Sequence, residues 1–306
     1  MTDHTLYKVD DDLFLTMLNP PIEGYDHFLS SWIYRGDITF LVDTGPSVTA
    51  GGLVAALESL GINRLDYILL THVHIDHAGA VGDIAVLFPE ATIVCHSRGI
   101  PHLVDPTALE EGSLKVLGET AEKYGPIRAV SEKRLVAAEG FMSNTVMPFP
   151  APGHSAHHVC YQTNRYFFVG EACGACFPGT MGPSYMRPAT PAPFYLDVAL
   201  QTLEDIAEMK PERLCFAHFG CYGDAGQLLS RHLAQLRLWE SVVNREIGRG
   251  TKGMDLELNV LKTLLEHDPL MHPFLDMQGA LRHRELFFIQ NSIKGFLSNA
   301  SRTASC

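Results

Sequence analysis

The fold is decided by Thr71-His72-Val73-His74-Ile75-Asp76-His77-Ala78-Gly79, a stretch with three histidines and one aspartate within six residues. It follows the mostly apolar run Asp66-Tyr67-Ile68-Leu69-Leu70, which predicts a buried strand. Zinc, iron and manganese accept imidazole and carboxylate ligands, so this order of residues at the end of a strand predicts a metal site. The alternative is a solvated polar loop. Such a loop would require neither this order nor Ala78-Gly79, two small residues that let a helix begin close to the strand.

The composition of the whole chain is typical of a soluble globular protein. Its 306 residues suffice for one large domain, or for one domain with an appendage. The net charge is −12 and no lysine or arginine cluster is dense, which disfavours nucleic acids and anionic membrane surfaces as partners. No apolar stretch is long enough to span a bilayer, and the N-terminus lacks a signal-peptide pattern. The seven cysteines are odd in number and irregularly spaced, so we expect free thiols and a cytoplasmic protein.

Hydrophobic patterns predict strands and helices that alternate along the first half of the chain. The expected strands are residues 13–17, 28–34, 38–42, 66–70 and 92–96. The expected helices are residues 48–60 and 80–87. Residues 97–140 are predicted to form a helical insertion, with a helical stretch over 109–124, that could overhang the site.

The second half is predicted to return to strands before a helical tail begins. The expected strands are residues 144–149, 158–163, 166–169 and 213–217, and residues 203–209 are expected to be helical. From residue 224 onward the apolar positions keep helical spacing, with further helices expected over 256–265 and 281–297. This tail could pack on the core, cap the site or form a homodimer, and the sequence leaves the three roles open.

Further candidate metal ligands follow the later strands, namely His154, Glu171 and His218. A dinuclear site needs about seven ligand atoms around two ions that lie roughly 3.5–4 Å apart. The sequence offers seven such residues: His72, His74, Asp76, His77, His154, Glu171 and His218. All of them lie at or just after the ends of predicted strands, where a rigid sheet presents its chemistry. A sandwich of two sheets would bring these separate loops together at one edge.

These motifs resemble those of the metallo-β-lactamase superfamily, hydrolases with an αββα fold. The matching pieces are Asp43-Thr44-Gly45, the stretch from Thr71 to Gly79, Pro152-Gly153-His154, Phe168-Val169-Gly170-Glu171 and Ala217-His218-Phe219-Gly220. The resemblance implies an α+β protein with a four-layer αββα sandwich over residues 1–222 and a helical C-terminal extension over 223–306. Within the superfamily, the stretch from Arg187 to Pro193 and the helical C-terminus resemble a bacterial branch with such an extension.

The resemblance also implies two divalent metal ions, which could be zinc, iron or manganese. The implied ligands are His72, His74 and His154 for one ion, and Asp76, His77 and His218 for the other. The residue at position 171 would bridge the two ions. Relatives usually have aspartate there, whereas this chain has Glu171, which is longer by one C–C bond of about 1.5 Å. The bridge could therefore shift, or bind one ion only.

The function predicted from this site is metal-dependent hydrolysis. A metal-bound hydroxide, available near pH ~7, would attack an acyl or phosphoryl centre. Asp76 is the candidate catalytic residue, because a carboxylate at this place could orient the nucleophile and pass its proton to the leaving group. The acidic chain favours a small ester, lactone or thioester over an anionic polymer. His27 and His102 are candidate substrate-pocket residues, since both lie in segments that could reach the site.

Two other functions remain open. One is an iron-dependent oxygenase, such as a persulfide dioxygenase-like enzyme, although oxygen-reducing relatives typically have glutamate where this chain has His74. The other is a metal-containing regulatory protein that binds partners through its helical tail. Either of His157 and His158 could support the metal ligands, and strand alternation predicts that one of them points inward as a core histidine. Cys173-Gly174-Ala175-Cys176 is expected to be a turn with small residues and not a redox site.

Overall fold

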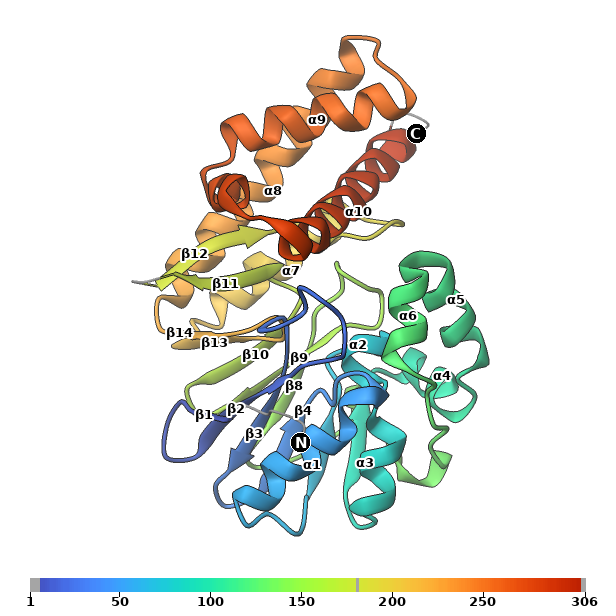
Figure 1. The fold of residues 1–306 in the computed structure, drawn as a ribbon. Helices are drawn as coiled ribbons and strands as arrows, with labels where there is room; N and C mark the ends of the chain where they lie inside the picture. The colour runs from blue at the N-terminus through green and yellow to red at the C-terminus, as the bar shows by residue number, and fades with distance from the viewer. Residues whose placement is uncertain (1–5, 180–181, 304–306) are drawn as a thin grey trace.

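The computed structural model describes residues 6–179 and 182–303. Two β-sheets pack face to face, and helices cover their outer faces (Figure 1). Between the sheets lies an aromatic core in which Trp32 and Phe40 of the first sheet meet Tyr161 and Phe168 of the second. The predicted α+β class and the αββα layering are therefore confirmed. None of the described helices is long and apolar enough to cross a membrane.

The first sheet has seven strands in the order β1-β2-β3-β4-β5-β6-β7. They are β1 (Leu6–Lys8), β2 (Leu13–Leu18), β3 (Leu29–Arg35), β4 (Thr39–Val42), β5 (Tyr67–Leu69), β6 (Thr92–Cys95) and β7 (Leu135–Ala137). Strands β1 to β4 pair antiparallel, whereas β4 to β7 pair parallel. Parallel strands end at the same edge of a sheet, so the loop after β5 emerges beside the loop after β4.

The second sheet has five strands in the order β14-β13-β10-β9-β8. They are β8 (Met147–Pro150), β9 (Val159–Thr163), β10 (Tyr166–Gly170), β13 (Arg213–Phe216) and β14 (Cys221–Tyr222). Strands β10 and β13 are parallel, so the loops that follow them leave the same edge. A separate hairpin of β11 (Ala175–Gly179) and β12 (Gly182–Arg187) links this sheet to the C-terminal helices.

Helices flank both sheets and build the insertion. In the first half they are α1 (Ala50–Ser59), α2 (Ile75–Ala78), α3 (Val81–Leu87), α4 (Ile100–Val104), α5 (Thr107–Leu117) and α6 (Glu119–Tyr124), with short 3-10 turns at Ser47–Thr49, Ser97–Gly99, Glu132–Arg134 and Ala138–Gly140. In the second half they are α7 (Leu196–Glu208), α8 (Ala225–Gly248), α9 (Gly253–His267), the 3-10 segment Pro269–Asp276 and α10 (Gly279–Thr303).

Most predicted elements are present, and three predictions need correction. The predicted helical stretch over 109–124 is two helices, because Gly118 between them has a φ of 56°, which interrupts an α-helix. The predicted helix over 203–209 begins seven residues earlier, at Leu196. The insertion over 97–140 is not purely helical, since β7 pairs with β6 and extends the first sheet.

The C-terminal extension packs against the second sheet and shares its core. Apolar residues of α10, including Ile289, Ile293 and Phe296, belong to the same buried cluster as Phe167 and Phe216 of the sheet. The first of the three roles left open by the sequence, packing on the core, is therefore confirmed. Homodimer formation through these helices stays a prediction.

Candidate metal centre

The central histidine motif leaves β5 and turns at once into the short helix α2. The loop after β4 fixes this turn, because the backbone N–H groups of Thr44 and Gly45 donate to the carbonyl oxygen of His77 at 2.7 and 3.1 Å. Gly79 is required where α2 ends, since a Cβ there would overlap the carbonyl oxygen of Ile75 and lie 2.9 Å from Cα of Pro46. The small residues of the motif therefore let α2 pack directly against the loop after β4.

The structure brings all seven predicted metal ligands together. They form two groups in which the ligand atoms lie within 4.8 Å of one another: His72, His74, His154 and Glu171 in the first, and Asp76, His77 and His218 in the second. Each group contains the three residues that the resemblance assigns to one ion. Donors this close, drawn from four separate loops, are the arrangement that a two-metal site requires.

Glu171 lies between the two groups. Its Oε2 is 3.0 Å from Nε2 of His154 and 3.4 Å from Nε2 of His77, and its Oε1 is 3.1 Å from Nε2 of His218. The backbone at this residue is fixed by His158, because the backbone N–H of Glu171 donates to Nε2 of His158 at 3.1 Å. The longer side chain thus places carboxylate oxygens close to nitrogens of both groups.

The donor set fits a metal because two of its histidine nitrogens lack a hydrogen-bond partner among the described residues. Nε2 of His72 and Nε2 of His77 are buried and have no hydrogen-bond partner among the described residues. Buried polar atoms are rarely left without a partner, because each one costs about 1–3 kcal/mol. Both nitrogens lie 3.4 Å from Oε2 of Glu171, so their lone pairs face the space that a metal would share with that carboxylate.

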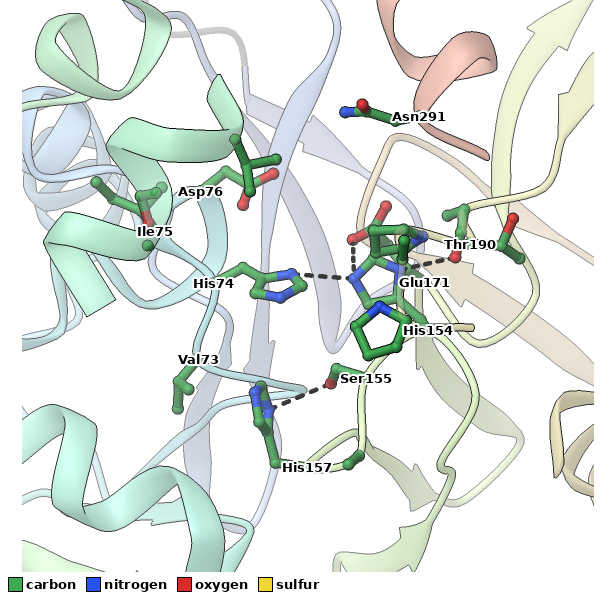
Figure 2. Close-up of a pocket in the computed structure, with 18 of the residues that line it drawn as sticks. Val73, His74, Ile75, Asp76, His154, Ser155, His157, Glu171, Thr190 and Asn291 are labelled. Atoms are coloured by element: carbon green, nitrogen blue, oxygen red, sulfur yellow. Dashed lines mark hydrogen bonds and ion pairs between the residues drawn. The ribbon is translucent and has the colours of Figure 1, made fainter. Parts of the chain in front are cut away.

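In His154 and His218, the ring nitrogen that faces away from the centre is hydrogen-bonded, and this bond determines whether the other ring nitrogen has a lone pair for a metal. Nδ1 of His154 lies 2.8 Å from the carbonyl oxygen of Ala189, and Nδ1 of His218 lies 3.2 Å from that of Phe28. A carbonyl oxygen only accepts, so both Nδ1 atoms carry the proton and leave an Nε2 lone pair for a metal. His74 is reversed: its Nδ1 points inward, 3.0 Å from Nε2 of His154 (Figure 2).

Asp43 likewise accepts a hydrogen bond from Nδ1 of His77 and so directs Nε2 of that ring toward the centre. Its Oδ2 lies 3.0 Å from Nδ1 of His77, and its two oxygens accept from the backbone N–H and the hydroxyl of Thr71 at 2.8 Å each. Thr71 Oγ1 also lies 3.0 Å from Nδ1 of His72. The sequence placed Asp43 in a matching motif but did not predict these bonds. Its left-handed φ of 59° aims the carboxylate at a loop 28 residues further along the chain.

The electrostatics keep His72, His74 and Glu171 in their metal-binding forms. Burial lowers the pKa of His74 to about 3 and holds that of His72 well below its usual range, so both rings are neutral. Burial raises the pKa of Glu171, but the neighbouring imidazoles of His154 and His218 outweigh it and hold the pKa well below its ordinary value. The carboxylate is therefore ionised.

A cavity of about 820 Å³ opens onto the cluster, and His74, Asp76, His154 and Glu171 line it (Figure 2). His102 from α4 also lines this cavity, as predicted for a pocket residue. His27 does not: its ring packs edge-on against Phe219, and its Nε2 lies 3.5 Å from the hydroxyl of Tyr7. The ring of His27 points away from the cavity although its neighbour Phe28 stacks on His218, so the pocket prediction for His27 is wrong.

The remaining histidines beside the cluster divide as strand alternation suggests. His158 is fully buried and supports Glu171, whereas His157 lines the cavity and lies 3.2 Å from the hydroxyl of Ser155. Sequence reasoning missed the cavity residues of α10, Phe288, Asn291 and Ser292. Only the three-dimensional packing of α10 brings them to the cavity. The tail therefore caps the site as well as packing on the core.

The fold and the paired ligand groups together define the class of protein. The family model described as Metallo-beta-lactamase superfamily matches residues 26–218, which is more than half of the chain. The chain therefore belongs to the metallo-β-lactamase superfamily. The metallo-beta-lactamase fold-containing protein ST1585 of Sulfurisphaera tokodaii is 27% identical over 239 residues, which are 74% of this chain and 86% of that protein.

Solved structures support the same fold. The crystal structure of ST1585 aligns with a TM-score of 0.67 at 21% identity, covering 92% of this chain and 98% of that one. The structure of TTHA1429 from Thermus thermophilus aligns with a TM-score of 0.65 at 18% identity, covering 97% of this chain and 95% of that one.

A hydroxyacylglutathione hydrolase of Salmonella paratyphi A is 29% identical over 163 residues, 50% of this chain and 53% of that enzyme. The chain thus matches about half the length of that relative.

Proposed function

We propose that the chain is a dinuclear metal-dependent hydrolase of small esters, lactones or thioesters. The observation that carries this proposal is the pair of ligand groups joined by Glu171, at the floor of a cavity large enough for a small molecule. Bound divalent ions would activate water and polarise the carbonyl group at neutral pH. His72, His74 and His154 would hold one ion, and Asp76, His77 and His218 the other.

Asp76 is the residue proposed to handle the proton. It lines the cavity and is only partly buried, whereas the histidines of its group are buried. The imidazole of His77 lies 3.4 Å from Oδ2 of Asp76, and the neighbouring charge holds the pKa of the carboxyl to about 2 although burial alone would raise it. An ionised carboxylate at the cavity floor can orient the attacking water, accept its proton and return it to the leaving group.

Among the candidate substrates, the relatives favour thioesters. The Salmonella relative is named for hydrolysis of hydroxyacylglutathione, which is a thioester. Attack on a thioester carbonyl and on an ester carbonyl both require an activated water, and a thiolate needs less help from an acid to leave than an alkoxide does. The proposal therefore extends to thioesters first, then to esters and lactones.

The test combines metal analysis with a substrate panel. We expect the purified protein to contain about two metal ions per chain and to hydrolyse at least one of an ester, a lactone and a thioester faster than a phosphodiester. His218→Ala should lose both the second ion and turnover while remaining folded. Full activity in a folded, metal-poor variant would refute the proposal. Oxygen uptake without hydrolysis would instead favour an iron-dependent oxygenase.

A further inference from the structure

Helix α5 presents a partly apolar face to the cavity. The residues of α5 that line the cavity include Leu109, Gly112, Ser113, Val116 and Leu117. Their spacing of three and four residues marks one face of a helix, which in a globular protein normally packs on the core. Leu109 and Leu117 pack partly on the core of the first sheet, whereas Val116 is 55% exposed. The apolar face of α5 therefore borders the cavity.

The opposite wall of the cavity is also apolar. It is formed by the loop Pro191–Pro193, Val198 of α7 and Phe288 of α10. Helix α10 adds the polar side chain of Asn291 to the cavity lining, and in the view of Figure 2 it lies between Asp76 and Thr190. Apolar walls with a small number of orienting polar groups are typical of sites that bind a largely apolar ligand. We call the space between α5, this loop and α10 the acyl chamber.

The wall of the same cavity also contains a buried hydroxyl group. Tyr124, the last residue of α6, lines the cavity and its hydroxyl has no hydrogen-bond partner in the described part of the chain. Helix α6 packs against α2, the helix that carries Asp76. The ring is fixed by an edge-on contact with Tyr25 at 6.2 Å, and the Tyr124 carbonyl oxygen accepts from Ser47 Oγ at 3.2 Å. The hydroxyl is fully buried, so Tyr124 forms a rigid part of the cavity wall and is not a contact for the substrate.

We propose that the substrate is an ester or thioester with an unbranched apolar acyl chain, which lies in the acyl chamber while its carbonyl group lies over the metal cluster. This inference rests on the proposed hydrolase function. The acyl chamber and the cluster of predicted metal ligands are parts of one cavity. An acyl chain that fills the chamber therefore places its carbonyl group at the ligand cluster. A short hydroxyacyl group would leave the apolar face of α5 exposed to water and would gain nothing from it.

The experiment is a chain-length series. Acyl esters and thioesters from acetyl to dodecanoyl are assayed with the metal-loaded full chain. We expect kcat/KM to rise about threefold to fourfold for each added methylene until the chamber is filled. Val116→Asn should flatten this rise, because it places an amide on the apolar face. Leu114→Asn is the matched control: Leu114 is 45% exposed on the same helix but does not line the cavity, so the rise should persist.

Binding gives a readout that does not depend on turnover. Decanoic acid should bind the metal-loaded protein more tightly than acetic acid, and Val116→Asn should reduce that difference whereas Leu114→Asn should not. Equal kcat/KM for acetyl and decanoyl substrates, together with equal binding of the two acids, would overturn the acyl chamber and leave the hydrolase intact. Absence of any hydrolysis together with selective binding of decanoic acid would reject the hydrolase and retain the chamber.

Discussion

Replacing Asp43 by asparagine exchanges one carboxylate oxygen beside the candidate metal centre for an NH2 group. This change should move the ring proton of His77 from Nδ1 to Nε2. In the native protein, Oδ1 of Asp43 accepts from the backbone N–H of Thr71, and Oδ2 accepts from the Thr71 hydroxyl and from Nδ1 of His77. In Asp43→Asn the remaining oxygen stays with the Thr71 N–H. The new amide NH2 then faces the Thr71 hydroxyl and Nδ1 of His77.

Two donors cannot share this contact, so Nδ1 of His77 must become the acceptor and its proton must move to Nε2. Nε2 is the atom that faces the centre, 3.4 Å from Glu171 and 3.4 Å from Asp76. A protonated Nε2 has no lone pair for a metal. Loss of an outer partner of a ligand typically costs 10–100-fold in metal affinity, and a reversed tautomer should give the upper end of that range. We therefore expect a loss of about 2–3 kcal/mol in metal binding.

The measurement is a zinc titration of the metal-free protein by calorimetry, with circular dichroism to confirm the fold. Asp66→Asn is the matched control, because the Asp66 carboxylate accepts from the backbone N–H of Thr39 at 2.8 Å and touches no histidine. The control should bind zinc with native affinity. Native affinity in Asp43→Asn would refute the reasoning, as would an equal loss in both variants.

Three further predictions follow from the structure. Removing metal with a chelator should lower the unfolding temperature in calorimetry, since a ligand at 100 times its Kd stabilises the folded state by about 2.7 kcal/mol; an unchanged temperature would argue against a resident metal. Tyr124→Phe should not lower the unfolding temperature because its hydroxyl is unpartnered, whereas Tyr161→Phe should cost about 1 kcal/mol because its hydroxyl donates to buried carbonyl oxygens; equal losses would contradict this. Burial raises the pKa of Glu285, but Arg187 and Arg284 outweigh burial and hold the pKa below 4.5. The ionised carboxylate therefore stabilises the folded state above pH 4.5. This stability is lost as the pH falls through the lowered pKa. Glu285→Gln should cost about 3–5 kcal/mol at pH 7 and flatten the acid limb of a stability-against-pH curve, and an unaltered limb would disprove the role.

The sequence predicted the elements whose signals are local. The strands that end in the metal ligands are short apolar runs bounded by turns, and the ligands follow them directly, so both could be located without the fold. The strands β1, β7 and β14 were missed because each is only two or three residues long and exists through pairing with a neighbour. A pattern within the chain cannot register a partner that is distant in sequence.

The same distinction applies to the site. The identity of the ligands follows from residue type and position, whereas the reach of Glu171 depends on the separation of two loops, which the sequence does not contain. The role of Asp43 depends on a bond to His77, 34 residues away. Asn291 reaches the cavity only because α10 crosses the end of the second sheet. The prediction that His27 reaches the pocket was wrong because the direction of a side chain in a loop depends on what it packs against, here Phe219.

Helix α10 couples the fold to the site because the same face anchors the helix and lines the cavity. It is anchored by Glu285, which accepts from Arg187 at 2.7 Å, and by Gly295, where a Cβ would overlap the carbonyl oxygen of Thr190. Phe288 and Asn291 lie seven and four residues before Gly295, on the same face, and line the cavity. A side chain at position 295 would push α10 away from the loop that also supports His154 through Ala189. Substitutions at position 295 should therefore change both stability and metal affinity, whereas substitutions at position 291 should alter substrate selection alone.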